Sequence, residues 1–116
     1  MENAFITITG LDHYFSQKPF TVGGIVRISK DHKNEYDSEA IRVEMPHIGT
    51  VGYVANSTHT VYTGTHSAGR LYDKMGEYAY AVVMFLTHSS VIAAVLSPEQ
   101  VEKEKTTIGF KADSAW

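Results

Sequence analysis

A tyrosine and an aspartate stand side by side in the polar segment NEYDSEAIRV, residues 34–43, just before a run in which apolar and polar residues alternate. Two interpretations fit this pattern. In the first, Tyr36 packs beneath the loop and Asp37 bonds a nearby backbone amide, as aspartates in turns commonly do. In the second, Tyr36 stacks on a flat ligand and Asp37 accepts a hydrogen bond from a ligand hydroxyl. The residues alone leave both interpretations open, and they define the first candidate site.

Six histidines and several acidic residues are the other groups that could do chemistry. Two acid–imidazole pairs, Asp12-His13 and Asp31-His32, lie in separate loops, and the other histidines are His47, His59, His66 and His88. A metal site needs several imidazole or carboxylate groups at one point, and none of these spacings is diagnostic of one. We therefore predict no metal site and no catalytic residue. An enzyme that uses Asp37 with His13 or His32 is the third alternative.

Residues 63–69, Thr-Gly-Thr-His-Ser-Ala-Gly, place two glycines before a predicted helix. Such a segment could hold a phosphate at the helix N-terminus, or it could be the plain turn that leads into the helix. We favour the turn, because the segment contains no lysine and no buried strand leads directly into it. The Gly-x-x-x-x-Gly-Lys, Gly-x-Ser-x-Gly and His-Glu-x-x-His motifs are absent. The sequence predicts no cofactor.

The composition is that of one globular domain. The chain has 116 residues, 43% hydrophobic and 20% charged, and the lack of cysteine excludes disulfide scaffolds, thiolate metal sites and cysteine nucleophiles. The formal net charge of −3 argues against a general nucleic-acid coat, although protonation of all six histidines adds six charges and gives +3. The N-terminus lacks the features of a signal peptide, and the apolar stretch 78–96 is interrupted at 87–90. We expect a cytoplasmic protein with no membrane partner.

The hydrophobic pattern has mostly a period of two, which is typical of strands. We expect strands at residues 5–9, 22–29, 40–45, 50–55, 78–87 and 91–96, with a bend or bulge at Gly23-Gly24 and a bulge at Gly52. Short helices are expected after Ser57, at 67–75 with Gly76 as the C′ residue, and from Ser97 onward. Short strands bent at glycines favour a small, partly closed β-barrel. It would form one domain at residues 1–105, followed by a loosely held tail at 106–116.

Two motifs together resemble the core signature of the HIRAN domain family. Residues 34–43 match the family pattern Asn-x-Tyr-Asp-x-x-Ala-Ile-x-Val, and residues 48–55, IGTVGYVA, match the Val-Gly-aromatic strand that follows it. The similarity covers about residues 5–95 and is greatest to short, stand-alone bacterial members. It implies a mainly β fold, an OB-like six-stranded barrel with two or three short helices.

The resemblance also implies a ligand. In the best understood members the barrel holds the 3′ end of a single DNA strand, the terminal base stacks on the motif's tyrosine, and the aspartate accepts a hydrogen bond from the 3′-hydroxyl. DNA-binding relatives carry basic side chains in the first loop and after the Val-Gly pair, where this chain has Asp12, Tyr53 and Asn56. The predicted DNA-binding residues are Tyr36, Asp37, His13 or Tyr14 on the other side of the base, Asn34, Tyr53, Asn56, Arg27, Arg42 and Arg70, with Lys30 and Lys33 as further phosphate contacts.

A protein-interaction module without nucleic-acid binding is the alternative function. The hairpin at residues 79–96 is more apolar than a small barrel needs. An unpaired strand edge there could build a symmetric homodimer, which Val83→Arg would dissolve.

Overall fold

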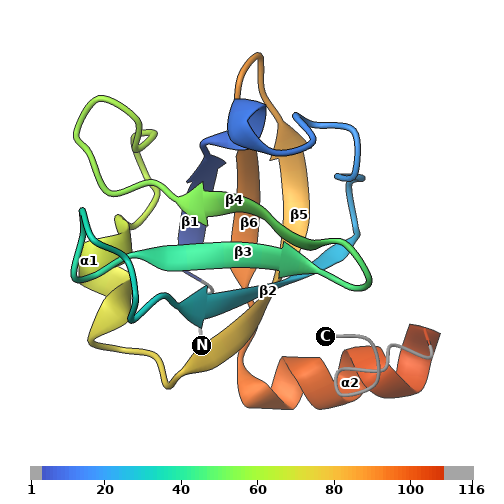
Figure 1. Cartoon of the computed structure of the whole chain (residues 1–116). Helices are drawn as coiled ribbons and strands as arrows, with labels where there is room; N and C mark the ends of the chain where they lie inside the picture. The colour runs from blue at the N-terminus through green and yellow to red at the C-terminus, as the bar shows by residue number, and fades with distance from the viewer. Residues whose placement is uncertain (1–3, 109–116) are drawn as a thin grey trace.

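The computed structural model describes residues 4–108, whose centre is a closed barrel of six antiparallel strands. The strands are β1 (Phe5–Thr9), β2 (Ile25–Lys30), β3 (Ile41–Met45), β4 (Gly49–Val54), β5 (Tyr78–Leu86) and β6 (Val91–Val95). Around the barrel they follow the order β1-β4-β3-β2-β5-β6, and β6 pairs with β1 to close the ring (Figure 1). The predicted six-stranded, mainly β barrel is confirmed, and its strand pairing is complete rather than partial.

Alternation along the strands fills the barrel with aliphatic side chains. The largest fully buried side chains include Ile6, Ile8, Ile28 and Ile41, which come from three strands. Between Ile6 and Ile8, Thr7 is also fully buried, because the segment that follows β4 covers the outside of β1. The Thr7 hydroxyl lies 2.8 Å from the hydroxyl oxygen of Thr65 in that segment, so the buried polar group has a partner.

Strand β2 begins three residues later than the hydrophobic pattern predicts. The ladder starts at Ile25 rather than at residue 22 and ends at Lys30. Gly23 has a φ of +89°, and the Gly24 amide donates to the Thr21 carbonyl at 2.9 Å. The predicted bend at the two glycines is therefore confirmed, and the predicted strand start is wrong because a tight turn takes its place.

Strand β4 contains the bulge predicted at Gly52. The register between β3 and β4 shifts after Val43, which pairs with Gly52, and this leaves Val51 as an extra residue. A Cβ atom on Gly52 would lie 2.9 Å from the carbonyl oxygen of Thr9. Glycine at this position therefore allows the end of β1 to lie directly against β4.

Closure of the barrel removes the free edge that the homodimer hypothesis requires. β5 pairs with β2 and β6, and β6 pairs with β5 and β1. Val83 is only 1% exposed, so Val83→Arg would put a charge into the core and disrupt folding whether or not a dimer forms. The prediction of an unpaired edge is therefore wrong, and so is the choice of Val83 as a surface position.

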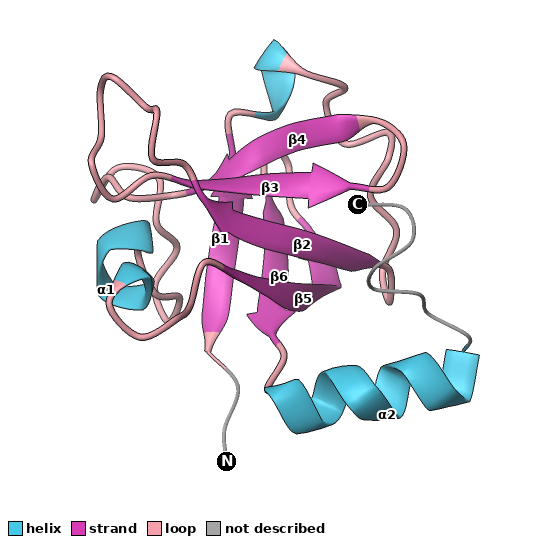
Figure 2. Cartoon of the chain, turned by 60° about the horizontal axis from the view of Figure 1, so that its bottom comes forward, coloured by secondary structure: helices cyan, strands magenta, loops and turns pink. Residues whose placement is uncertain are grey.

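Three short helices surround the barrel: η1 (Leu11–His13), α1 (Ala68–Tyr72) and α2 (Pro98–Ile108). Figure 2 shows α2 leaving the end of β6 and running along the outside of the barrel. The predicted cap of α2 is confirmed, because the Ser97 hydroxyl accepts the Gln100 amide at 3.2 Å and the Gln100 side chain accepts the Ser97 amide at 2.7 Å.

The helix ends differ from the predictions in two places. α1 ends at Tyr72 rather than at residue 75, and Gly76 is not among the residues with positive φ, so it is not the C′ residue. α2 continues to Ile108, so residues 106–108 belong to the helix and not to a tail. The rest of the predicted tail, residues 109–116, lies outside the described residues. The predicted turn after Ser57 is one helical turn, in which the Val61 amide donates to the Ser57 carbonyl at 3.0 Å.

Candidate nucleic-acid interface

The Asn34 side chain holds the first half of the loop between β2 and β3 in shape. The Asn34 side-chain oxygen accepts the backbone amides of Tyr36 and Asp37 at 2.9 and 3.0 Å, and the Asn34 amide donates to the Asp31 carbonyl at 3.2 Å. Asparagine suits this role because its short side chain reaches amides two and three residues ahead. The loop backbone is therefore ordered before any ligand arrives.

Tyr36 lies at the outside of this loop with its ring in solvent. Its side chain is 94% exposed, so the interpretation in which it packs beneath the loop is excluded. An exposed aromatic ring on a fixed backbone offers both faces to a planar ligand at little conformational cost. The ring therefore stands on an open surface.

Asp37 uses both carboxylate oxygens within the protein. Oδ1 accepts the backbone amide of Glu39 and Oδ2 accepts the side-chain amide of Asn56, each at 2.9 Å. Asn56 in turn accepts the Gly69 amide at 2.8 Å, which connects the loop to α1. An ionised carboxylate has about four acceptor positions, so Asp37 is oriented by these bonds and keeps acceptor capacity for a ligand.

On the other side of the loop, Asp31 joins Tyr53 to Arg42. The Tyr53 hydroxyl donates to Asp31 Oδ2 at 2.6 Å, and Arg42 Nη1 lies 3.5 Å from Asp31 Oδ1. The bond from Tyr53 holds the pKa of Asp31 below its usual value. Burial, together with the Asp31 carboxylate, raises the pKa of Tyr53 to about 12. The Tyr14 ring lies against Tyr53 with 6.5 Å between centroids and a tilt of 36°.

Arg27 and Arg42, two of the predicted phosphate contacts, both bind the carboxylate of Glu44. Glu44 Oε1 accepts from Arg27 Nε at 3.1 Å and from the Ser29 hydroxyl at 2.7 Å, and Oε2 accepts from Arg42 Nε at 3.1 Å. Burial would raise the pKa of Glu44, but the bonds from Ser29, Arg42 and Arg27 outweigh it and hold the pKa below its usual value. The charges of Arg27 and Arg42 are thus balanced by acids on the barrel.

Arg70, another predicted phosphate contact, lies beside Asn56. Among residues 4–108 it forms no ion pair. Both side chains line a groove of about 340 Å³ that also carries the hydroxyl groups of Ser57, Thr63 and Ser67. A phosphate seated in this groove could meet the Arg70 guanidinium next to the Asp37–Asn56 pair.

The first amides of α1 are already bonded, so residues 63–69 do not form a free phosphate cradle. Ala68, Gly69 and Arg70 donate their amides to the Ala55 carbonyl, the Asn56 side chain and the Ser67 hydroxyl, at 3.0, 2.8 and 3.3 Å. The favoured interpretation, a turn that leads into a helix, is the one that the structure supports.

The sequence model of the HIRAN domain matches residues 1–100. The chain belongs to the HIRAN domain family. This is a family known as DNA-binding modules. Among solved structures, the HIRAN domain of human HLTF is 20% identical, with a TM-score of 0.55 over 95% of this chain and 91% of that one. A protein from Lactobacillus plantarum is 21% identical, with a TM-score of 0.58 over 79% of this chain and 88% of that one. These likenesses support the fold, and no curated protein matches the chain.

In this HIRAN domain the predicted residues fall into two neighbouring groups. Asn34, Tyr36, Asp37, Asn56 and Arg70 form one group, and Tyr14, Tyr53 and Arg42 form the other, with Arg27 farther along the barrel. His13 is exposed in η1. The connection between the two groups, Asp31, was not predicted, because the sequence does not show that a loop aspartate meets a tyrosine on another strand.

The remaining histidines form no metal site. His32 Nε2 pairs with Glu77 at 2.5 Å, and the Nδ1 atom of His66 is buried without a partner. Within residues 4–108, no group of three or more histidine and acidic side chains comes together as a metal would require. No helix in the same span has the length and apolar character needed to cross a bilayer.

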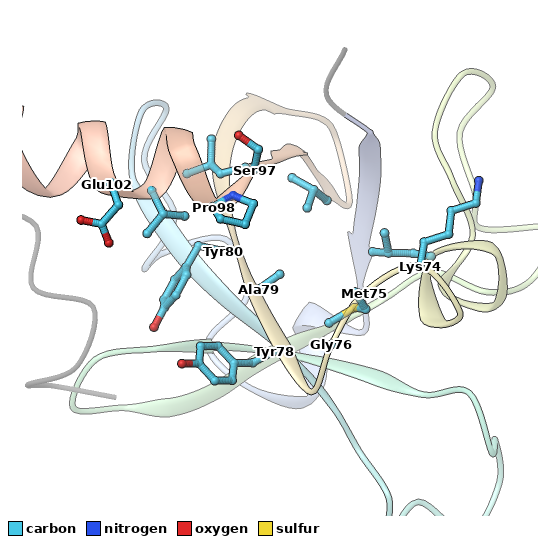
Figure 3. A pocket seen from close by; sticks show the side chains of 13 residues that line it. Lys74, Met75, Gly76, Tyr78, Ala79, Tyr80, Ser97, Pro98 and Glu102 are labelled. Atoms are coloured by element: carbon cyan, nitrogen blue, oxygen red, sulfur yellow. The ribbon is translucent and has the colours of Figure 1, made fainter. Parts of the chain in front are cut away.

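A separate hollow of about 510 Å³ lies between α1, β5, β6 and α2 (Figure 3). Its lining is mainly apolar and includes Met75, Ala79 and Pro98, with the rings of Tyr78 and Tyr80 along one side. It shares no lining residue with the Asn56 groove. No sequence pattern predicted this hollow, because it depends on how α2 packs.

Proposed function

We propose that this chain is a non-catalytic module that binds the 3′ end of single-stranded DNA. The observation that carries the proposal is the Tyr36 ring, fully open to solvent on a loop whose backbone Asn34 fixes, beside the oriented carboxylate of Asp37. The terminal base stacks on Tyr36, and Asp37 accepts a hydrogen bond from the 3′-hydroxyl.

The expected affinity follows from these two contacts. Stacking on an aromatic ring contributes about 1–3 kcal/mol per base, and a hydrogen bond to a charged acceptor contributes about 1.5–3 kcal/mol. One or two stacked bases and this bond give roughly 3–9 kcal/mol before ordering costs, which corresponds to millimolar to micromolar dissociation constants. A 3′-phosphate would meet the Asp37 carboxylate, so charge repulsion makes the site selective for a free hydroxyl.

Contacts to phosphates are few in this proposal. Arg70 contacts the phosphate nearest the Asp37–Asn56 pair, while Arg27 and Arg42 remain paired with Glu44. Each phosphate neutralised on a single strand contributes about −0.7 to the slope of log K against log salt. With one to three contacts the slope is therefore only about −0.7 to −2.1, shallow for a DNA-binding protein.

The test compares 5′-labelled oligo-dT with a free 3′-hydroxyl and its 3′-phosphorylated twin by fluorescence anisotropy. The native chain should bind the hydroxyl form more tightly, and Tyr36→Ala should weaken that binding about 5- to 150-fold, the equivalent of one lost stack. Tyr36→Phe keeps the ring and should retain the affinity. Tyr78→Ala removes another exposed tyrosine, on β5, and serves as the matched control.

Asp37→Asn tests the hydroxyl contact, because it removes the negative charge that would repel a 3′-phosphate. This variant should bind the two oligonucleotides equally, and a thermal melt shows whether its bonds to Glu39 and Asn56 still hold the loop. Equal affinity of the native chain for both oligonucleotides would rule out end recognition by Asp37.

A second proposal, self-association, rests on three consecutive apolar residues of β5 that face solvent. Met84, Phe85 and Leu86 are all exposed, next to a register shift between β5 and β6. Monomeric proteins seldom expose contiguous apolar patches, so a symmetric pair of chains could bury this one. A dimer in sizing chromatography that Phe85→Asp converts to monomer would support it, and a native monomer would exclude it.

A further inference from the structure

A second hollow lies between the segment that follows η1 and the turn that joins β3 to β4. Figure 1 shows the course of these two segments. It measures about 500 Å³ and is lined by Tyr14, Phe15, Ser16, Lys18, Pro19 and Ile48. Tyr14 and Phe15 are 40% and 47% exposed, so both rings are accessible within it. Two accessible rings beside one cation are the elements with which proteins hold single-stranded nucleic acid without reading its sequence.

This hollow is connected to the Tyr36 loop across the outer face of β4. The Tyr14 ring packs against Tyr53, whose hydroxyl bonds Asp31 at the start of the loop. Ile48 precedes β4 and Tyr53 lies near its end, so the two are about 17 Å apart at roughly 3.4 Å per strand residue. A ligand that contacts the Tyr36 loop and continues past Tyr53 to Ile48 is therefore an extended chain.

Lys18 is the charged residue among those that line the hollow, and its positive charge favours an anionic strand. The Lys18 side chain is exposed, and within residues 4–108 it has no ion pair. The nearby carboxylate of Asp12 accepts a long hydrogen bond from the Ser16 hydroxyl, at 3.5 Å. Lys18 is thus available for a phosphate, in contrast to Arg27 and Arg42, which are held by Glu44.

We propose that this hollow is a second subsite for the same DNA strand, in which an upstream base stacks on Phe15 and Lys18 contacts a backbone phosphate. The inference rests on the proposed function, because the strand that fills the hollow begins with its 3′ end on Tyr36. Stacked nucleotides advance about 3.4 Å each, so roughly five correspond to the about 17 Å along β4 from Tyr53, beside the Tyr36 loop, to Ile48 at the far end of the hollow. That number lies within the about 4–16 nucleotides that OB folds cover.

The experiment is a length series, oligo-dT of two, four, six and eight nucleotides with free 3′-hydroxyls, titrated against the full chain. Binding should strengthen roughly tenfold once the strand is long enough to reach the hollow, between four and eight nucleotides. Phe15→Ala should abolish this gain and leave both the affinity for the two-nucleotide strand and the preference for a 3′-hydroxyl unchanged. Lys18→Gln should lower the salt slope of the eight-nucleotide strand by about 0.7.

Two matched controls separate the subsite from general surface effects. Phe85→Ala removes another exposed phenylalanine, on β5, and Lys74→Gln removes another exposed lysine, after α1; both should keep the gain with length. A native chain whose affinity does not change with length, or a gain that survives Phe15→Ala, would overturn the subsite while end recognition stands. A chain that binds none of the oligonucleotides would overturn the proposed function and the subsite together.

Discussion

Replacing Glu44 by glutamine tests whether one carboxylate holds together the outer face of β2 and β3. Glu44 accepts three hydrogen bonds, from Arg27, Ser29 and Arg42, and its side chain is only 14% exposed. Glutamine has nearly the same shape but replaces one acceptor oxygen by an amide group. That group would point its N–H bonds at an arginine that can only donate.

The stability that Glu44→Gln is expected to remove lies between the values measured for surface and for buried ion pairs. Fully exposed pairs contribute about 0–1 kcal/mol, and breaking a buried pair costs about 3–5 kcal/mol. For this half-buried cluster we expect Glu44→Gln to lower the free energy of unfolding by about 1.5–3 kcal/mol, the range of one bond to a charged group. At about 4 °C per kcal/mol for a domain of this size, the Tm falls by about 6–12 °C at pH 7.

The pH dependence provides the decisive assay. Because the folded protein holds the pKa of Glu44 below its usual value of 4.5, the stability that this carboxylate contributes is fully present above pH ~4.5 and is lost as the pH falls through the folded pKa. Glutamine does not titrate. Thermal melts from pH 7 to pH 3 should therefore show that the difference in Tm between the native chain and Glu44→Gln becomes smaller in acid.

A matched control is Glu35→Gln, which removes an exposed carboxylate in the β2–β3 loop and should change the Tm little. If Glu44→Gln melts with the native chain at pH 7, or if the gap stays constant down to pH 3, the three bonds do not stabilise the fold as inferred.

Two further outcomes are expected. Gly52→Ala should destabilise the barrel by about 1–3 kcal/mol in a urea titration, because its Cβ would lie 2.9 Å from the Thr9 carbonyl oxygen; Gly76→Ala, whose Cβ meets nothing within 4 Å, should change stability by less than about 1 kcal/mol. Binding to DNA should tighten from pH 7.5 to pH 6, because protonation of histidine, which in free solution occurs near pH ~6.5, adds positive charge; a flat profile would show that no histidine contacts a phosphate.

The strands were predictable because apolar and polar residues alternate along some of them, as in β3, and because others, such as β6, are short apolar runs next to turn residues. The errors arose where a local pattern was ambiguous. Val22 continues the apolar pattern of β2, but the two glycines after it form a turn, and the apolar hairpin of β5 and β6 gave no sign that β1 would close the barrel against it. Pairing between the first and last strands depends on the whole topology and cannot be seen in a short window of sequence.

The candidate site was predictable only to the level of one loop. The Asn-x-Tyr-Asp pattern identified the residues that the structure brings together around Asn34. The partners of the arginines were not predictable, because Arg42 and Glu44 are two residues apart on one face of β3 and meet Arg27 from a different strand. Sequence showed which positive charges exist, and the structure shows which of them are already neutralised.

The pairing of β1 with β6 has a consequence for how the chain acquires its fold. Phe5 lies opposite Ala94, so the contact that seals the ring joins residues separated by almost the entire domain. Folds dominated by such distant contacts form slowly compared with helical bundles. During synthesis on the ribosome, β1 cannot pair with β6 until β6 has left the exit tunnel. A chain cut short after β5 would have two unpaired strand edges, which are sites of aggregation.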